Sequence, residues 1–549
     1  MTEHPGVSGA HNAAGGSRRF EATERDEMPQ GPEMSESSDA LDPNALRERV
    51  LDALRRGGRF CGLFGSAAPG GTQLLAVVAH EGAFRTTTMN VPAGLSSYPA
   101  LTPSIAAAAW YEREIHDLFG LEPAGHPRLD PLVLPLADGA AHPRPGSHGN
   151  ASPRAPSPLA PSPLAPSPRA PGLVQLDTTP LPAHLHGEGV FTLPYGPVRS
   201  GVFESIEYLL ETPGEYLPHV RSRVYYKHRG IEVRFEGMDV ADGVLLAERF
   251  EGTASVAHAI AFSRAIERLA GMTASEEAEL VRIIHAELER VAAHLDTFIR
   301  QVEAAGQAVA YSRLTLHKER VQRLRARLCG SRFGRGVVIP GGVAGAPSLQ
   351  RSDLVAITGK IESAATADLR LLMATPSFVD RLRGTGVVPE EVARRHGAVG
   401  PVGRGSGQTV DVRASHPYGA YGLLGYEPVE PSDEGDVLAR QRVRLQEIAG
   451  AFRLIEGAAL RLDRVAGSGR WRVPLEAGVS GEALGWAESP QGEILSLVRA
   501  EEGHLVRVKP RSASFHNLAL FATAFPRDIF TDFAFIEASF GLSVAGVAG

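Results

Sequence analysis

Apolar residues recur every three or four positions along several long stretches in the second half of the chain. After residue 276, seven of them keep this spacing: Leu280, Ile284, Leu288, Val291, Leu295, Phe298 and Val302. This period predicts a helix with one buried face. Thr273 and Glu276 have the spacing of a capping box, which would begin that helix. Similar patterns predict helices over 313–328, 352–372 and 437–460, so we expect a bundle of long helices.

The first part of the chain alternates on a shorter scale. Runs separated by Gly and Pro predict strands at 59–65, 72–80 and 84–91, after a helix over 45–56. A helix over 104–119 would end at Gly120, a residue type common at helix C-termini. Further along, the same signals predict strands at 190–193 and 205–210 and a hairpin from 493–499 and 505–509.

Two segments lack such patterns. Residues 1–45 hold almost no aliphatic side chains, and we expect a disordered tail. Residues 137–182 contain an Ala-Pro-Ser-Pro repeat at 155–168, which predicts an extended linker, with a ligand for a polyproline-recognising domain as the alternative. A domain over 46–136 and another over 183–549 remain. The predicted fold class is α+β: a small N-terminal α+β domain, a Pro-rich linker, and a large, mainly α-helical bundle with small peripheral β-sheets.

Composition narrows the class of protein. The net charge of -7 over 549 residues gives no indication of nucleic-acid binding. Only two cysteines occur, Cys61 and Cys329, so neither a disulfide framework nor a Cys-x-x-Cys metal site is predicted. No run approaches the roughly 20 apolar residues of a membrane-spanning helix, and the first residues lack the pattern of a signal peptide. We therefore expect a cytoplasmic chain that reaches a membrane only through partners.

Charged residues gather in front of one predicted core helix. His228-Arg229-Gly230-Ile231-Glu232 form a turn, and the segment from Glu251 to His258 leads into the helix. Charged groups in front of a buried helix indicate a buried site.

Several motifs resemble two subunits of respiratory complex I. Residues 110–121, Trp-Tyr-Glu-Arg-Glu-Ile-His-Asp-Leu-Phe-Gly-Leu, followed by Gly-His-Pro at 125–127, are similar to the hallmark of the 30-kDa subunit. The second domain resembles the 49-kDa subunit and the large subunits of energy-converting nickel–iron hydrogenases. Its matching motifs lie at 228–232, 286–295, 340–343, 400–407, 411–413, 416–421 and 435–437. Together the two domains most resemble the large subunit of formate hydrogenlyase-type complexes.

The resemblance implies a site that has lost its metal. In the hydrogenases, two Cys-x-x-Cys pairs hold the nickel–iron centre. Here the first pair falls on Glu251 and Ala254, and the second on Ser543 and Gly546. A carboxylate, a methyl, a hydroxyl and a backbone cannot replace four soft thiolates. We therefore predict no metal site and no hydrogenase activity.

In the complex I branch, the resemblance implies a quinone in the same place. That branch uses a histidine in the first β-hairpin and a tyrosine near the first cysteine position. Arg199 stands about where the histidine would lie, and no tyrosine occurs between Glu251 and His258. Arg199 can donate to a quinone carbonyl or bind an anion, but a guanidinium does not release its proton. Arg199 and Arg229 are the predicted ligand-binding residues, for a quinone or another small acceptor.

Three residues are predicted to be catalytic: His258, Glu232 and Glu251. Glu232 would relay protons, or else form a structural salt bridge with Arg229 or a neighbouring helix. An unpaired buried carboxylate costs several kcal/mol, so Glu251 needs a partner, Arg199 or Arg249, or must stay protonated. For His258, a core histidine without chemistry is the alternative.

Two further groups of polar residues are expected to be structural. One set of packing and polar anchors lies on the helix after residue 276: His285, Glu287, Glu289 and His294. A loop-closing ion-pair network is expected in Gly-rich loops: Arg404, Asp411, Arg413 and His416.

The resemblance implies a subunit of a membrane-associated oxidoreductase complex of the NADH:quinone type, with the quinone and NAD binding of that class. It would dock on an iron–sulfur small subunit carrying a 4Fe-4S cluster, above membrane antiporter-like subunits, on the inner face of the cell membrane. No cofactor is expected to be tightly bound in this chain. The alternative is a redox-inactive structural and coupling subunit of such a complex.

Overall fold

The computed structural model describes residues 43–136, 140–146, 183–199, 204–465 and 469–549, which belong to one unit, Pro32–Gly549. Most of the predicted tail and linker therefore lies outside the described residues. The described residues combine long helices with small, mostly antiparallel sheets, which confirms the α+β fold class. Within these ranges, no helix is both long and apolar enough to cross a membrane.

The N-terminal region starts with helix α1 (Pro43–Arg55) and a three-stranded antiparallel sheet. Its strands are β1 (Arg59–Ala68), β2 (Gly71–His80) and β3 (Ala83–Pro92). Smaller elements follow: β4 (Ser97–Pro99), the turn η1 (Ala106–Ala108), α2 (Ala109–Phe119) and β5 (Glu122–Ala124), with β4 and β5 paired in parallel. Gly120 ends α2 in the left-handed conformation, at φ 69°, as predicted.

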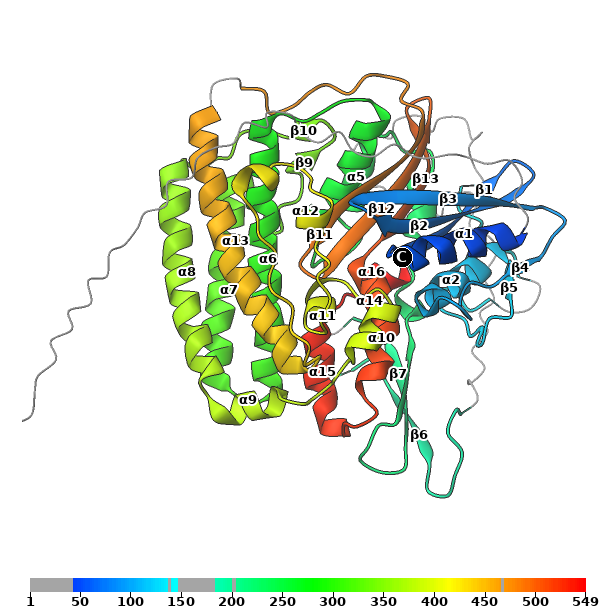
Figure 1. The fold of residues 1–549 in the computed structure, drawn as a ribbon. Coiled ribbons are helices and arrows are strands. Elements are labelled where there is room, and N and C mark those ends of the chain that lie inside the picture. The colour runs from blue at the N-terminus through cyan, green and yellow to red at the C-terminus, as the bar shows by residue number, and fades with distance from the viewer. Residues whose placement is uncertain (1–42, 137–139, 147–182, 200–203, 466–468) are drawn as a thin grey trace, which may run out of the picture. The chain divides into compact units, whose positions relative to one another are not determined.

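Four long helices lie side by side in the second region (Figure 1). They are α6 (Glu276–Ala304), α7 (Ala308–Cys329), α8 (Arg351–Met373) and α13 (Val437–Val465). The start of α6 differs from the prediction, because Ser275 rather than Thr273 is the N-cap. The extended backbone of Ser275 aims its hydroxyl at the N–H of Ala278, which donates to it at 3.2 Å.

Shorter helices complete the helical part of the described residues. They are α3 (Ile231–Phe235), α4 (Gly243–Ala247), α5 (Ser255–Leu269), α9 (Pro376–Leu382), α10 (Glu390–Arg395), α11 (Gly400–Arg404), α12 (Val412–Ser415), α14 (Ala513–Phe521), α15 (Phe533–Phe540) and α16 (Ala545–Ala548). Single 3-10 turns are η2 (Tyr225–Lys227), η3 (Gly422–Leu424), η4 (Ala522–Ala524) and η5 (Phe530–Asp532). Helix α5 is almost wholly buried, because it packs on both α6 and a sheet.

That sheet consists of β11 (Gly481–Ser489), β12 (Gly492–Glu501) and β13 (His504–Arg511). The β12–β13 hairpin confirms the prediction, whereas β11 was not predicted. Gly485 on β11 explains its close packing on α5, since a Cβ atom there would overlap the carbonyl oxygen of Ala261. Smaller sheets are formed by β6 (Phe191–Tyr195), β7 (Glu207–Thr212) and β8 (His219–Arg223), and by β9 (Val338–Ile339) with β10 (Gly342–Val343).

Buried polar contacts join the N-terminal region to β13. Lys509 donates from Nζ to Glu114 on α2 and to Glu232 on α3, both at 2.6 Å. Burial raises the pKa of Glu114 to about 7, and the charge of Lys509 only partly offsets this. The Tyr111 hydroxyl donates to Nδ1 of His516 at 2.8 Å. The N-terminal region is therefore fastened to the second region by specific contacts.

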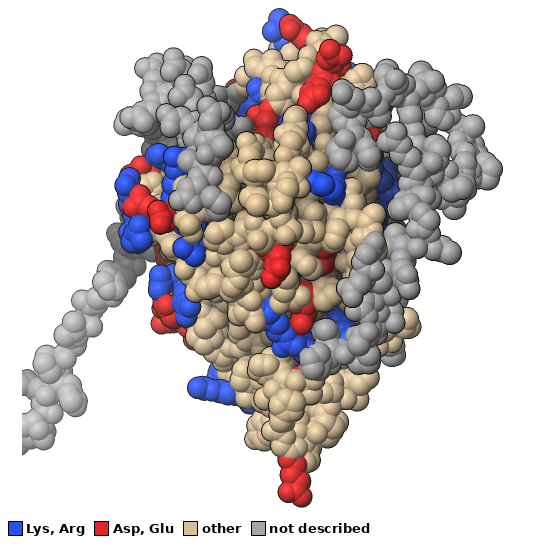
Figure 2. Space-filling view, turned by 90° about the vertical axis from the view of Figure 1, so that its right-hand side faces the viewer, with Lys and Arg blue, Asp and Glu red and all other residues tan. Residues whose placement is uncertain are grey.

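Charged side chains of both signs are mixed on the face seen in Figure 2, and neither sign covers a wide continuous area of its described residues. The hairpin of β6 and β7 exposes apolar residues instead: Phe191 is 51 % and Val198 is 89 % exposed. The predicted ligand-binding residue Arg199 lies in the loop of this hairpin, between β6 and β7.

Candidate functional site

The turn at Gly230 fastens the segment around α16. Gly230 takes a left-handed φ of 62°, which lets the chain turn directly into α3. Arg229 donates from Nη2 to the carbonyl of Ala545 at 3.0 Å and also to the carbonyl of Phe250. Its backbone N–H donates to the carbonyl of Gly549 at 2.8 Å. The predicted ligand-binding residue Arg229 thus ties α16 to the segment before α5.

Residues that the resemblance matches to the four thiolates come together from two distant segments, because Gly546 contacts both Glu251 and Ser543. Glu251, Ala254, Ser543 and Gly546 are all buried. A Cβ atom on Gly546 would overlap Oε2 of Glu251, so that only glycine leaves room for this carboxylate. The two segments that the resemblance pairs are therefore neighbours, although they are almost 300 positions apart in the sequence.

These residues do not fit a nickel–iron centre. The Glu251 carboxylate fills the space beside Gly546, and Ala254 ends in a methyl group. The hydroxyl of Ser543 donates to Glu204 at 3.0 Å. One carboxylate and one hydroxyl are not equivalent to four thiolates, which soft metals prefer.

The two cysteines lie in other elements. Cys61 is buried on β1, and Cys329 ends α7. Burial raises the pKa of Cys61 to about 12, which keeps it a thiol. Neither can supply a missing ligand at the site.

Glu251 and His258 form a buried pair at the start of α5. Oε1 of Glu251 is 3.5 Å from Nε2 of His258, and the two residues are 1 % and 2 % exposed. Within the described part of the chain, neither carboxylate oxygen nor this ring nitrogen has a hydrogen-bond partner. Such buried atoms are rare in proteins, and a bound water or a catalytic role commonly explains them. Two of the three predicted catalytic residues are thus adjacent.

Neither predicted arginine is the partner of Glu251. Arg199 pairs instead with Glu537, and Arg249 pairs with Glu248. The prediction is wrong for Arg249 because its half-exposed side chain lies at the surface beside Glu248, whereas Glu251 is buried.

Glu232 lies apart from this pair. It forms ion pairs with Arg507 and Lys509, each at 2.6 Å, and so the predicted salt bridge to Arg229 is wrong. The reason is that α3 packs on β13, which carries both cations. Burial favours the neutral acid, but the two positive charges outweigh it and lower the pKa of Glu232 to about 2.

A cavity of about 80 Å³ lies beside the segments that carry Glu251 and Gly546. Arg199 on its wall donates to both carboxylate oxygens of Glu537 on α15, at 2.9 and 2.8 Å. The Tyr208 hydroxyl donates to the same carboxylate at 2.8 Å. Burial raises the pKa of Tyr208 well above its usual value, so the phenol keeps its proton. Thr253 and Ser543 also line the cavity and belong to the segments that carry Glu251 and Gly546.

Sequence reasoning missed Tyr208 and Glu537. The only signal for Glu537 was a single carboxylate in the apolar stretch Phe-Ala-Phe-Ile-Glu-Ala-Ser-Phe. Its contact with Arg199 spans 338 positions, which no local pattern indicates.

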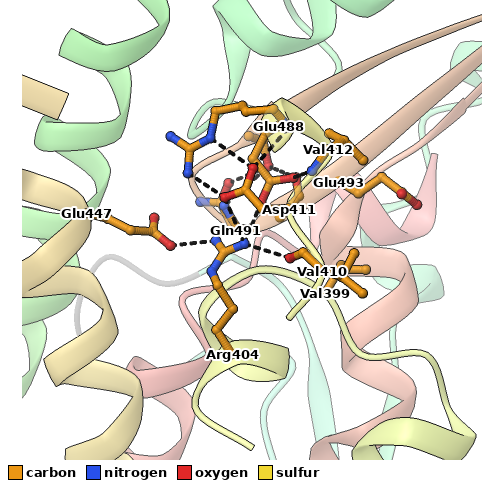
Figure 3. A network of polar contacts seen from close by, with 12 residues as sticks. Val399, Arg404, Val410, Asp411, Val412, Glu447, Glu488, Gln491 and Glu493 are labelled. Carbon is orange, nitrogen blue, oxygen red and sulfur yellow. Dashed lines mark hydrogen bonds and ion pairs between the residues drawn. The ribbon is translucent and has the colours of Figure 1, made fainter. Parts of the chain in front are cut away.

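A network of buried ion pairs joins α6, α11, α13 and β11 (Figure 3). Arg404 lies at its centre and donates to Asp411 at 3.2 Å, to Glu488 at 3.1 Å and to Glu447. It also donates to the carbonyl of Val410 at 2.8 Å. We call this the Arg404 network.

The network extends on both sides of Arg404. Arg413 donates to the two oxygens of Asp411 at 3.0 and 2.7 Å, and Arg290 donates to Glu287 at 2.9 Å. Ion pairs therefore confirm the predicted network for Arg404, Asp411 and Arg413. The prediction is wrong for His416, whose ring stacks on Phe84 of β3 with centroids 4.2 Å apart.

Two other predicted anchors on α6, Glu289 and His285, lie outside the Arg404 network. Glu289 accepts the backbone N–H groups of Val256 and Ala257 at 2.9 and 3.1 Å, at the start of α5. Burial lowers the pKa of His285 to about 3 and keeps it neutral. Glu289 therefore holds the helix that carries His258.

Comparisons with known proteins agree with the motifs. The family model of the respiratory-chain NADH dehydrogenase 49 Kd subunit matches residues 305–476, and that of the 30 Kd subunit matches residues 50–144. A solved structure of the membrane-bound sulfane sulfur reductase, an archaeal respiratory membrane complex, aligns with a TM-score of 0.62. It covers 66 % of this chain and 99 % of that chain at 24 % identity, a likeness of fold.

Similar proteins come from both branches. The membrane-bound hydrogenase subunit alpha of Pyrococcus furiosus is 31 % identical over 60 % of this chain and 81 % of its own length. Formate hydrogenlyase subunit 5 of Escherichia coli is 28 % identical over 79 % and 73 %. An NADH-quinone oxidoreductase subunit of Deinococcus radiodurans is 29 % identical over 61 % and 90 %. The chain therefore belongs to the family of energy-converting hydrogenase large subunits and complex I 49-kDa subunits, with a region like the complex I 30-kDa subunit fused ahead of it.

Proposed function

We propose that this chain is the acceptor-reducing subunit of a membrane-associated, complex I-like oxidoreductase complex and is not a hydrogenase. The observation that supports this proposal is that Glu251, Ala254, Ser543 and Gly546, which the resemblance matches to the four thiolates, are buried and that the Glu251 carboxylate lies against Gly546. The fold of the family is present, but this donor set cannot hold its metal.

Electrons would come from a 4Fe-4S cluster in an iron–sulfur small subunit. The chain would lie on the inner face of the cell membrane, above antiporter-like subunits, as the named relatives and the structural likeness suggest. No NAD site is proposed in this chain, because NAD-linked steps of such complexes would take place in other subunits.

The acceptor, a quinone or another small molecule, would bind in the cavity beside Arg199. Arg199 and Tyr208 both carry hydrogen-bond donors that can turn from Glu537 to a carbonyl oxygen. Reduction of a quinone takes two electrons and two protons. The buried Glu251–His258 pair, beside the cavity wall, is the proposed source of a proton, because the Glu251 carboxylate and Nε2 of His258 have no hydrogen-bond partner among the described residues.

A redox-inactive structural and coupling subunit is the second candidate. It is favoured by one observation: the Glu251 carboxylate already fills the space beside Gly546, where a side chain of the second pair would be. In that case the cavity beside Arg199 would bind no acceptor.

Affinity purification of the full complex from its native membrane tests the proposal. We expect an iron–sulfur subunit and membrane subunits to co-purify, less than stoichiometric nickel, and reduction of a soluble quinone analogue by a viologen donor. Arg199→Gln should lower the analogue's reduction rate roughly 10–100-fold, the value of a charge-assisted hydrogen bond. Arg394→Gln, on the exposed end of α10, is the matched control and should leave the rate unchanged.

The outcomes separate the candidates. One nickel per chain would overturn our interpretation of the site. Absence of iron–sulfur and membrane partners would contradict membership in such a complex. An assembled complex that reduces no acceptor, with Arg199→Gln behaving like the control, would favour the structural subunit.

A further inference from the structure

The buried Arg404 network has more acidic than basic groups. Every member is at most 3 % exposed: the carboxylates Glu287, Asp411, Glu447 and Glu488, the guanidiniums of Arg290, Arg404 and Arg413, and the imidazole of His294. Four ionised carboxylates and three guanidiniums leave one negative charge in excess. A buried charge without compensation is costly, and so the network favours binding one proton.

Nearby cations do not remove this excess by direct pairing. Arg444 on α13 lies closest to Glu447 but donates to the backbone carbonyls of Arg440 and Phe540. It forms no ion pair with a carboxylate in the described part of the chain. The charge of Arg444 therefore influences Glu447 rather than Glu488.

His294 is one of two positions for the proton. Its Nε2 lies 2.7 Å from a carboxylate oxygen of Glu447. Burial lowers the pKa of His294 to about 4, although Glu447 opposes this effect. His294 is therefore a neutral donor to an ionised Glu447, and the proton belongs elsewhere.

Glu488 on β11 is the other position and has the weakest set of partners. Its Oε1 accepts from Nη1 of Arg404 at 3.1 Å, but the same nitrogen also serves Asp411 and Val410. Its Oε2 accepts the backbone N–H of Val412 at the long distance of 3.3 Å. Asp411, by contrast, has Arg413 on both oxygens.

The surroundings of Glu488 include charges from every packed element. Asp411 repels it, while Arg404, Arg413, Arg290 and Arg59 of β1 attract it. The hydroxyl of Tyr418 accepts its backbone N–H at 2.8 Å. Burial is the largest influence, and with the repulsion from Asp411 it raises the pKa of Glu488 to about 7.

We propose that Glu488 is a proton-binding site inside the Arg404 network, so that the network alternates between a neutral and a singly negative state. The ligand is a proton, and the site stands independently of any acceptor at Arg199. The net charge at the junction of α6, α13 and β11 changes by one unit when Glu488 binds or releases this proton.

Glu488→Gln tests this site, because an amide imitates the protonated acid. Tight proton binding by the folded chain stabilises it fully below about pH 4.5, and this contribution is lost as the pH rises to about 7. In the purified complex, Glu488→Gln should match the wild type in its urea midpoint at acidic pH and exceed it in alkaline buffer. Infrared difference spectra of wild type minus variant should show a protonated carboxyl band in mildly acidic buffer.

Glu447→Gln is the matched comparison, since Glu447 is ionised and paired with Arg404 and His294. It should lower the midpoint at every pH or prevent folding. If Glu488→Gln lowers the midpoint as Glu447→Gln does, or fails to fold, the proposal is wrong. It is also wrong if the difference spectrum lacks a protonated carboxyl band.

Discussion

The Glu251–Gly546 contact and the Arg404 network are both buried, but their carboxylates differ in their partners. In the Arg404 network each carboxylate has at least one guanidinium partner. Beside Gly546, by contrast, both oxygens of Glu251 lack a hydrogen-bond partner among the described residues. Buried ion pairs stabilise a fold, and buried polar atoms with few or no partners are the candidates for proton or ligand exchange. In this chain we therefore expect the ion pairs of the Arg404 network to contribute most to stability, and Glu251 to contribute little.

The largest effect is expected at the centre of the network. Arg404→Met would leave Glu447, Asp411 and Glu488 without their shared cation, which should destabilise the chain by about 3–5 kcal/mol. Urea unfolding measures this change. Arg394→Met, whose partner Glu391 is 61 % exposed, should cost at most about 1 kcal/mol. Similar losses in the two variants would remove the contrast between buried and exposed pairs.

An intermediate effect is expected at Gly546. Gly546→Ala places a methyl group on the Glu251 carboxylate and should cost about 1–3 kcal/mol through overpacking. Adding Glu251→Ala should restore most of that loss, because it removes the overlapping atoms. A double-mutant cycle of unfolding free energies measures the coupling. Additive effects would mean that the two side chains do not meet.

The smallest effect is expected for Glu251→Gln. The substitution keeps the shape and removes no hydrogen bond, because the described residues give this carboxylate no partner. Its free energy of unfolding should change by less than about 1 kcal/mol. A loss as large as that expected for Glu447→Gln would show that Glu251 stabilises the fold after all.

Local patterns were sufficient for the long helices and for most strands. The repeat from Leu280 to Val302 predicts α6, and Gly120 ends α2 as expected. Strand β11 was missed because Gly-Glu-Ala-Leu-Gly-Trp-Ala-Glu-Ser contains no β-branched residue, and its Gly485 is required by packing on α5. Helix spacing does not determine which residue near a helix start takes the extended backbone of an N-cap, so Ser275 was overlooked.

The candidate site could be predicted from the sequence only in part. Motif matches to the family paired the segments of Glu251 and Gly546, and these segments do contact each other, because a shared family determines which segments meet. Partners of individual charges did not follow from spacing: Glu232 pairs with β13, and Arg199 pairs with Glu537. These pairings depend on which cation a long-range fold brings to each carboxylate, and neighbours in sequence do not indicate that.

The contact between Lys509 and Glu114 has a consequence for how the chain is made. These residues are 395 positions apart, so the contact can form only when almost all of the chain has left the ribosome. Until then the helix that carries Glu114 lacks its cation, and the ring of Tyr111 lacks Phe515, its neighbour at 4.9 Å. Part of the N-terminal region is therefore completed only near the end of synthesis, after its buried Glu114 and Tyr111 have waited for their partners.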